Sequence, residues 1–261
     1  METTYNDALS LELGQFAIVY VLLLIVLAVM KKCKIDQSKL VIIASLRMTG
    51  QLFLAGFILT YIFENPHPLF TAAYVVAIIG FGYHTILSKN KQLNGRFKVI
   101  IGMSLALCGI SILAFYTTIV LRQNFFHPQF TIPLSGTIIG NAVGGLVLGL
   151  KAFNDNIKSQ RNKIDTLINM GVTPEKTLLP LINQSIETAI LPTIITMISM
   201  GIIKLPGMMT GQMLAGTMPM TAILYQISVI IAIAAVTSLS VFSALYFGYK
   251  TLYNERNQLL I

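Results

Sequence analysis

Long uninterrupted runs of apolar residues recur along this chain and constrain its fold more than any other feature. A run of 18 or more such residues is long enough to cross about 30 Å of hydrocarbon as an α-helix. These runs occupy more than half of the 261 residues, and only 11% of the residues are charged, against roughly 25% in soluble domains. The pattern excludes an ordinary water-soluble enzyme and predicts an all-α integral membrane protein.

Hydropathy predicts seven transmembrane helices in a single transmembrane domain over residues 1–261. The first twelve residues carry acidic but no basic side chains, and the first lysines follow the apolar run, so we expect a retained helix rather than a cleaved signal peptide. This places the N-terminus outside and, after seven crossings, the C-terminus inside. The expected helices cover residues 13–30, 40–63, 69–87, 99–121, 130–150, 186–203 and 221–248.

The sixth predicted helix is the weakest, because it is short and contains Glu187 and Pro192. A six-helix arrangement therefore stays open at this stage.

The basic residues support the predicted topology independently of hydropathy. Fifteen of the 18 Lys and Arg residues fall in segments that the topology places inside, whereas Arg122 and Lys204 fall outside and Arg47 lies within a helix. The net charge of +8 is thus explained by membrane insertion, and we expect no nucleic-acid partner. The expected location is the cytoplasmic membrane, as a multi-pass protein.

The longest segment between predicted spans, residues 151–185, is expected on the inner side. It holds a polar helix with one apolar face from about Lys158 to Met170, which the Gly171–Pro174 sequence interrupts. A second helix follows, and we expect the Thr173 side chain to cap it and Pro174 to occupy its first turn.

Signatures of catalysis are absent. Gly144 and Gly149 have the spacing of a phosphate-binding loop, but Leu150 stands where the lysine of such a loop must be. Neither Gly-x-Ser-x-Gly nor His-Glu-x-x-His occurs, and the three histidines share no metal-ligand spacing. We therefore expect no catalytic residue, no metal site and no cofactor in this chain.

Small and polar residues mark the fifth predicted helix. Gly136, Gly140 and Gly144 recur at intervals of four, a pattern that favours close helix packing. Asn141 in the same helix must either pair with a neighbouring helix or face a hydrated pathway, and both alternatives stay open.

The segment that joins the last two predicted helices is rich in methionine and glycine. Pro206 and Pro219 are expected to mark the ends of a short helix in which Gly207 and Gly211 face one side. The methionines fit ordinary packing, a gate, or contact with a soft metal.

Several of these sequences resemble the permease subunits of the Fet-type iron-export ABC transporters, whose relatives include plant permeases linked to aluminium tolerance. A looser likeness to the inner-loop motif of ABC permeases lies in Asp165, Gly171 and Thr173-Pro174, although Asn183-Gln184 replace the Leu-Pro of its second half. The sequences that carry the closer resemblance are Ile132-Pro133, Gly136, Gly140-Asn141-Ala142, Met170–Pro174, Leu205–Gly211, Ala215-Gly216, Pro219, Ala222 and Tyr225-Gln226-Ile227.

The resemblance implies a permease subunit that exports iron, pairs with a second copy of itself, and works with a separate P-loop ATPase subunit that binds ATP and Mg²⁺. A stand-alone channel or secondary transporter for a metal ion or small organic solute is the alternative, because the chain offers no deep carboxylates or histidines for a bare divalent cation. Residues 151–185 would form the inner coupling segment. The coupling residues would be Asp165, Gly171, Thr173 and Pro174, and the pathway or gate residues Asn141, Pro206, Gly207, Met208, Met209, Gly211, Tyr225 and Gln226.

Overall fold

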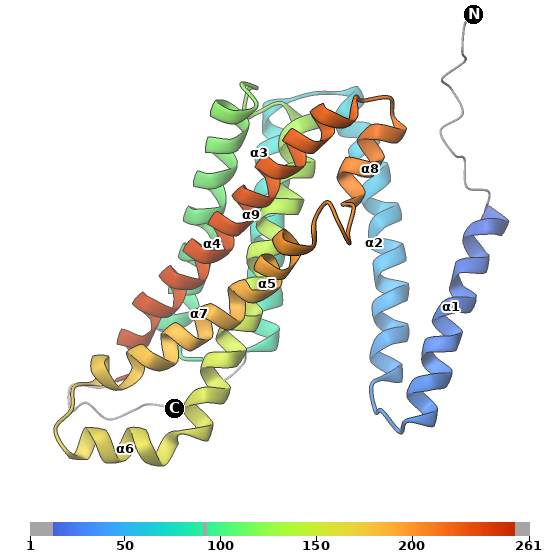
Figure 1. The fold of residues 1–261 in the computed structure, drawn as a ribbon. Coiled ribbons are helices and arrows are strands. Elements are labelled where there is room, and N and C mark those ends of the chain that lie inside the picture. The colour runs from blue at the N-terminus through green and yellow to red at the C-terminus, as the bar shows by residue number, and fades with distance from the viewer. Residues whose placement is uncertain (1–12, 91–92, 254–261) are drawn as a thin grey trace, which may run out of the picture. The chain divides into compact units, whose positions relative to one another are not determined.

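A computed structural model describes residues 13–90 and 93–253, and within these ranges the regular elements are all helical (Figure 1). The prediction of an all-α protein is confirmed. The α-helices are α1 (Leu13–Lys32), α2 (Ser38–Glu64), α3 (Pro68–Lys89), α4 (Gly95–Phe115), α5 (Pro128–Ser159), α6 (Arg161–Asn169), α7 (Pro174–Ser199), α8 (Gly207–Leu214) and α9 (Pro219–Gly248). A π-helical turn, η1 (Tyr116–Val120), extends α4, and a 3₁₀ turn, η2 (Tyr249–Leu252), extends α9.

Seven helices of the described ranges are long and apolar enough to cross a membrane, and they match the seven predicted spans one to one. Most extend beyond the predicted ends, because polar turns outside the hydrocarbon continue the same helices. The orientation of the termini stays a prediction. Some of the charged residues on which that prediction rests lie outside the described residues, namely the acidic N-terminal residues and the basic residues Lys91 and Arg256.

The sixth spanning helix begins much earlier than expected. Residues 186–203 were predicted, but α7 runs from Pro174 to Ser199 and continues through Pro180 and Pro192. Its first turns bury Leu178 and Ile182, which pack in the main core and hold the helix together. The helix ends where Met200 becomes extended and Gly201 adopts a φ of +85°. Within residues 13–90 and 93–253, seven helices rather than six are therefore long and apolar enough to span a membrane.

The contacts divide the chain into two compact units. The first contains α1, α2 and the segment Gln212–Thr217, and the second contains Pro66–Gly211 and the chain from Met218 onward. The prediction of a single transmembrane domain stays a prediction.

The first unit is built around a helical hairpin of α1 and α2. The Tyr20 hydroxyl hydrogen-bonds to that of Thr49, which also donates to the Ser45 carbonyl at 3.0 Å. The Phe16 and Phe53 rings meet edge to face, with centroids 6.4 Å apart. An apolar cavity of about 750 Å³ lies between the two helices.

The core of the second unit lies where α5 and α9 pack against each other and against α4 and α7. A β-carbon added at Gly145 of α5 would overlap the Thr237 side chain of α9. One added at Gly149 would lie 2.9 Å from Val241 Cγ1 and 3.2 Å from Ala189 Cβ. These two glycines therefore allow α9 and α7 to approach the backbone of α5.

The predicted glycine stripe on α5 lies on a different face. Gly136, Gly140 and Gly144 are exposed, and a β-carbon added at any of them would meet no atom within 4 Å in the described part of the chain. A packing role for this stripe needs a partner beyond those contacts and stays a prediction.

Candidate functional site

The four predicted coupling residues lie in one helix-turn-helix formed by α6 and the start of α7. α6 is amphipathic, and its Ile164 is only 2% exposed within the core cluster that also contains Ile157 and Leu178. Only Gln160 separates α6 from the end of α5. The helix is therefore anchored by one apolar face, and its polar face is left to solvent.

The turn between α6 and α7 has the hydrogen bonds of a Schellman motif. Gly171 N–H donates to the Ile168 carbonyl at 2.9 Å, and Val172 N–H donates to the Leu167 carbonyl at 3.0 Å. Gly171 has a φ of +83°, a conformation that glycine adopts without strain. The turn leaves the Met170 side chain 75% exposed, so an apolar side chain lies at the tip of the helix-turn-helix.

Thr173 occupies the N-cap position of α7, but its hydroxyl makes no capping hydrogen bond. The prediction of a side-chain cap is therefore wrong, whereas Pro174 does begin the helix as expected. Residues Thr173, Glu175 and Lys176 are exposed, so water can satisfy the first backbone donors and no cap is needed. Glu175 in the first turn is favourably placed near the positive end of the helix dipole.

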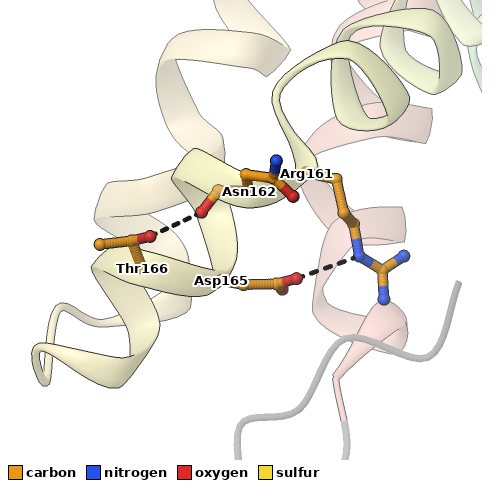
Figure 2. Close-up of polar contacts among 4 residues, drawn as sticks. All are labelled: Arg161, Asn162, Asp165 and Thr166. Carbon is orange, nitrogen blue, oxygen red and sulfur yellow. Dashed lines mark hydrogen bonds and ion pairs between the residues drawn. The ribbon is translucent and has the colours of Figure 1, made fainter.

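Asp165 lies on the polar face of α6 and pairs with Arg161 one turn earlier (Figure 2). The Arg161 Nε atom is 3.5 Å from Asp165 Oδ2, and the two side chains are 42% and 51% exposed. Thr166 points to the other side of the helix, where its hydroxyl donates to the Asn162 carbonyl at 2.7 Å. An ion pair this exposed contributes little to stability, so Asp165 can change partners at small cost.

The helix-turn-helix is continuous with two helices, α5 and α7, that are longer than a bilayer requires. α5 has 32 residues and α7 has 26, which correspond to about 48 Å and 39 Å, against about 30 Å of hydrocarbon. α6 joins the end of α5 to the start of α7, and α5 and α7 pack together around Gly149 and Ala189. A displacement of α6 would therefore act on two long, mutually packed helices.

The predicted pathway residues lie in three elements and in different environments. On α5, Asn141 is exposed and its side-chain Nδ2 donates to the Thr137 carbonyl of its own helix at 2.7 Å. On α9, Gln226 is only 8% exposed, and its Oε1 atom has no hydrogen-bond partner within residues 13–90 and 93–253. Tyr225 is half-buried against Tyr116, with ring centroids 6.4 Å apart.

The remaining pathway residues lie in α8 or directly before it: Pro206, Gly207, Met208, Met209 and Gly211. Pro206 directly precedes this helix, Gly207 begins it, and Met209 is buried. The predicted start is confirmed, but the helix ends at Leu214, and Pro219 is instead the first residue of α9. Gly216, with a φ of +91°, lies in the intervening turn.

Sequence reasoning missed several buried polar groups of the second unit. The Tyr116 and Ser228 hydroxyls are 2.7 Å apart, at the point where α4 becomes π-helical. On α9, the hydroxyls of Thr237 and Ser240 are buried without a partner among the described residues. The recurrence of Ser and Thr within the apolar sequence of α9 is the signal that could have identified them.

Within the described residues, no group of three or more His, Cys, Asp and Glu side chains is arranged to hold a metal ion.

Residues 13–253 match the Uncharacterised protein family (UPF0014). The chain belongs to this family. It is 29% identical over 256 residues to the Probable iron export permease protein FetB of Escherichia coli, covering 98% of this chain and 95% of the relative. It is 27% identical to UPF0014 membrane protein YjkA of Bacillus subtilis, covering 97% and 98%.

A plant relative extends the comparison. The chain is 27% identical over 244 residues to Protein ALUMINUM SENSITIVE 3 of Arabidopsis thaliana, covering 93% of this chain and 87% of the relative. No solved structure matches. The predicted resemblance to Fet-type permeases is confirmed, and the chain is a multi-pass membrane protein with a permease-type relative.

Proposed function

We propose that this chain is the permease subunit of an ATP-driven transporter that exports iron across the cytoplasmic membrane. The similarity to FetB over nearly the whole chain supports the substrate and the direction. The observation that carries the proposal is the inner helix-turn-helix, whose exposed Met170 tip is joined to the ends of two spanning helices. A separate P-loop ATPase would supply the ATP and Mg²⁺ chemistry, and two copies of each subunit would make the transporter.

The hairpin provides a physical route from ATP hydrolysis to transport. Closure of the partner ATPase around ATP would press on the turn at Gly171 and Pro174. Because α6 buries Ile164 in the core between α5 and α7, the pressure would shift both helices together. The spanning helices would then exchange between inward-open and outward-open packings, an equilibrium that nucleotide biases.

The cargo would meet neutral oxygen atoms and thioethers rather than carboxylates. Asn141, Tyr225 and Gln226 supply amide and hydroxyl groups, and the segment from Pro206 to Gly211, with Met208 and Met209, would act as a gate. Neutral ligands of this kind are less suited to a bare divalent ion than to iron that keeps part of its own coordination shell.

The test is purification of the tagged chain in mild detergent with whatever ATPase accompanies it. We expect a P-loop ATPase to copurify and its ATP hydrolysis to rise with iron but not with control metals. Copurification without stimulation would retain the ABC permease and reject iron as the substrate. If no ATPase associates, the stand-alone channel or secondary transporter becomes the better interpretation.

A further inference from the structure

Three helices of the second unit can be compared in height, because they meet at one residue. A β-carbon added at Gly149 of α5 would lie 3.2 Å from Ala189 Cβ of α7 and 2.9 Å from Val241 Cγ1 of α9. These three residues therefore lie at one level, from which the remaining length of each helix can be measured.

α7 ends far below the level at which α5 and α9 begin. At 1.5 Å per residue, α5 reaches back from this level to Pro128 over about 32 Å, and α9 reaches back to Pro219 over about 33 Å. α7 extends in the same direction only to Ser199, about 15 Å away. Figure 1 shows the end of α7 below the first turns of α5 and α9. The sixth span is therefore a helix that breaks near the middle of the hydrocarbon.

A compact turn follows the end of α7. The N–H groups of Ile203 and Lys204 both donate to the Ser199 carbonyl at 3.0 Å. Gly201, with a φ of +85°, donates its N–H to the Lys204 carbonyl at 3.1 Å. These bonds keep the backbone of Lys204 at the level of Ser199. The predicted topology placed Lys204 outside the membrane, whereas the fold places it at mid-height.

The Lys204 ammonium group forms no ion pair among the residues that the structure describes. Glu187, the acidic residue of α7 closest to this level, lies about 18 Å before Ser199 along the helix axis. A second copy of the chain would bring the same acidic groups at the same levels, so it would not supply a counter-ion either. The other acidic residues of the described ranges lie near the ends of spanning helices or in the helix-turn-helix: Asp36, Glu64, Asp155, Asp165 and Glu175.

The surroundings of this turn follow from its depth. Backbone outside a regular helix occurs at such a depth only where protein or water surrounds it. The second unit does not cover the turn, because Lys204 is exposed and the side chains of Ile202 and Ile203 are 92% and 85% exposed. An ammonium group at mid-membrane needs water or a counter-ion, and the four-carbon stem of lysine is too short to reach either surface from there. The turn therefore faces a hydrated cavity.

We infer that this break is an anion site in the transport pathway, at which Lys204 binds a carboxylate of the complex in which iron is carried. The inference rests on the proposed function and names the substrate class as a negatively charged iron complex. α8 begins at Gly207, shortly after Lys204, and the positive end of its dipole adds to the same preference. A complex that brings its own carboxylates to the metal needs a cation from the protein, which agrees with the shortage of acidic groups at this depth.

The hydration of the break is tested by thiol labelling of the full chain in proteoliposomes. In a Cys33→Ser, Cys108→Ser background, Ile203→Cys should react with a hydrophilic methanethiosulfonate reagent, present on both sides of the membrane, at least about tenfold faster than Ile231→Cys. Ile231 is the matched control, because it is 55% exposed on α9 and lies about 15 Å from Val241, at the level of Ser199. Equal rates at the two positions would reject a hydrated break.

The charge preference is tested on the same Ile203→Cys protein with two methanethiosulfonate reagents of similar size, one with a sulfonate group and one with a trimethylammonium group. Adding Lys204→Gln should lower the ratio of the sulfonate rate to the trimethylammonium rate about tenfold, because it removes the local positive charge. Lys204→Arg, which keeps the charge, should keep the ratio. A ratio that Lys204→Gln leaves unchanged would overturn the anion site.

The ligand is tested with ferric citrate, a carboxylate complex of iron, in proteoliposomes that contain the permease and its ATPase. Lys204→Gln should raise the KM for ferric citrate about tenfold, the order expected for one charged hydrogen bond, with kcat and the unfolding temperature little changed. Lys204→Arg should stay close to wild type. A wild-type KM in Lys204→Gln would overturn the inference while the proposed function stands. A wild-type complex that moves no iron with ATP would overturn the proposed function and iron as the cargo, whereas labelling that depends on Lys204 would still support the anion site.

Discussion

Gly248 of α9 lies directly against the ring of Phe97 in α4, so closely that a β-carbon at position 248 would overlap three carbon atoms of the ring. Phe97 is fully buried and meets Phe153 edge to face, with centroids 6.5 Å apart. The ring therefore has no space into which it could retreat. This contact holds the start of α4 close to the end of α9.

We expect Gly248→Ala to destabilise the protein by about 1–3 kcal/mol, the usual cost of overpacking a filled core. Thermal unfolding in detergent measures the effect. Gly80→Ala is the control, because Gly80 is exposed in mid-helix with no atom within 4 Å of an added β-carbon. Adding Phe97→Leu to Gly248→Ala should recover part of the loss, and an unfolding temperature unchanged by Gly248→Ala alone would contradict the packing.

Two adjacent glycines of α5 should respond differently to the same substitution. Gly145→Ala should lower stability by about 1–3 kcal/mol, because the new methyl group would overlap Thr237. Gly144→Ala should be neutral or slightly stabilising, since an added β-carbon there meets open space. Denaturation of the purified variants measures the stability of each. Adding Thr237→Ser should restore part of the stability that Gly145→Ala loses. Equal losses at both positions would mean that α9 does not approach α5 at this point.

Replacing Gly171 with valine should uncouple ATP hydrolysis from transport. A β-branched residue at a φ of +83° costs about 1–2 kcal/mol or more, so the turn at the tip of the hairpin would change its shape. Iron efflux should fall while ATP hydrolysis continues, as measured together in proteoliposomes. Gly171→Asn tolerates the same backbone conformation and should retain most of the coupling; unimpaired transport by Gly171→Val would remove this turn from the mechanism.

Asn141→Leu should reduce iron transport without changing the stability of the fold. The Asn141 side chain is exposed, and its Nδ2 atom donates to the Thr137 carbonyl of its own helix, so leucine should cause no internal clash. Transport assays and unfolding curves should be compared with those of Asn141→Gln, which keeps the amide. Normal transport by Asn141→Leu would assign the residue to packing rather than to the pathway.

The local structure of the candidate coupling segment, a turn between two helices, was largely predictable because its signals are local. Gly171 marks the end of α6 because only glycine readily adopts the positive φ of a Schellman turn, and Pro174 begins α7 because it lacks an N–H that the first turn does not use. The Thr173 cap was not predictable, since solvent around an exposed helix end makes the side-chain bond unnecessary. The early start of α7 was missed because its first turns are polar on one side and are stabilised by packing of Leu178 and Ile182.

The sequence by itself determined the number of spanning helices and the helix-turn-helix between the fifth and sixth spans, because length, hydropathy and turn residues act over a few neighbouring positions. Only the tertiary structure decided that Gly145 and Gly149, rather than Gly136, Gly140 and Gly144, meet other helices. It also decided that the Tyr253 hydroxyl is buried without a hydrogen-bond partner among the described residues. These relationships depend on which faces of distant helices pack together. Hydropathy does not distinguish a helix face that packs against protein from one that faces lipid, because both are apolar.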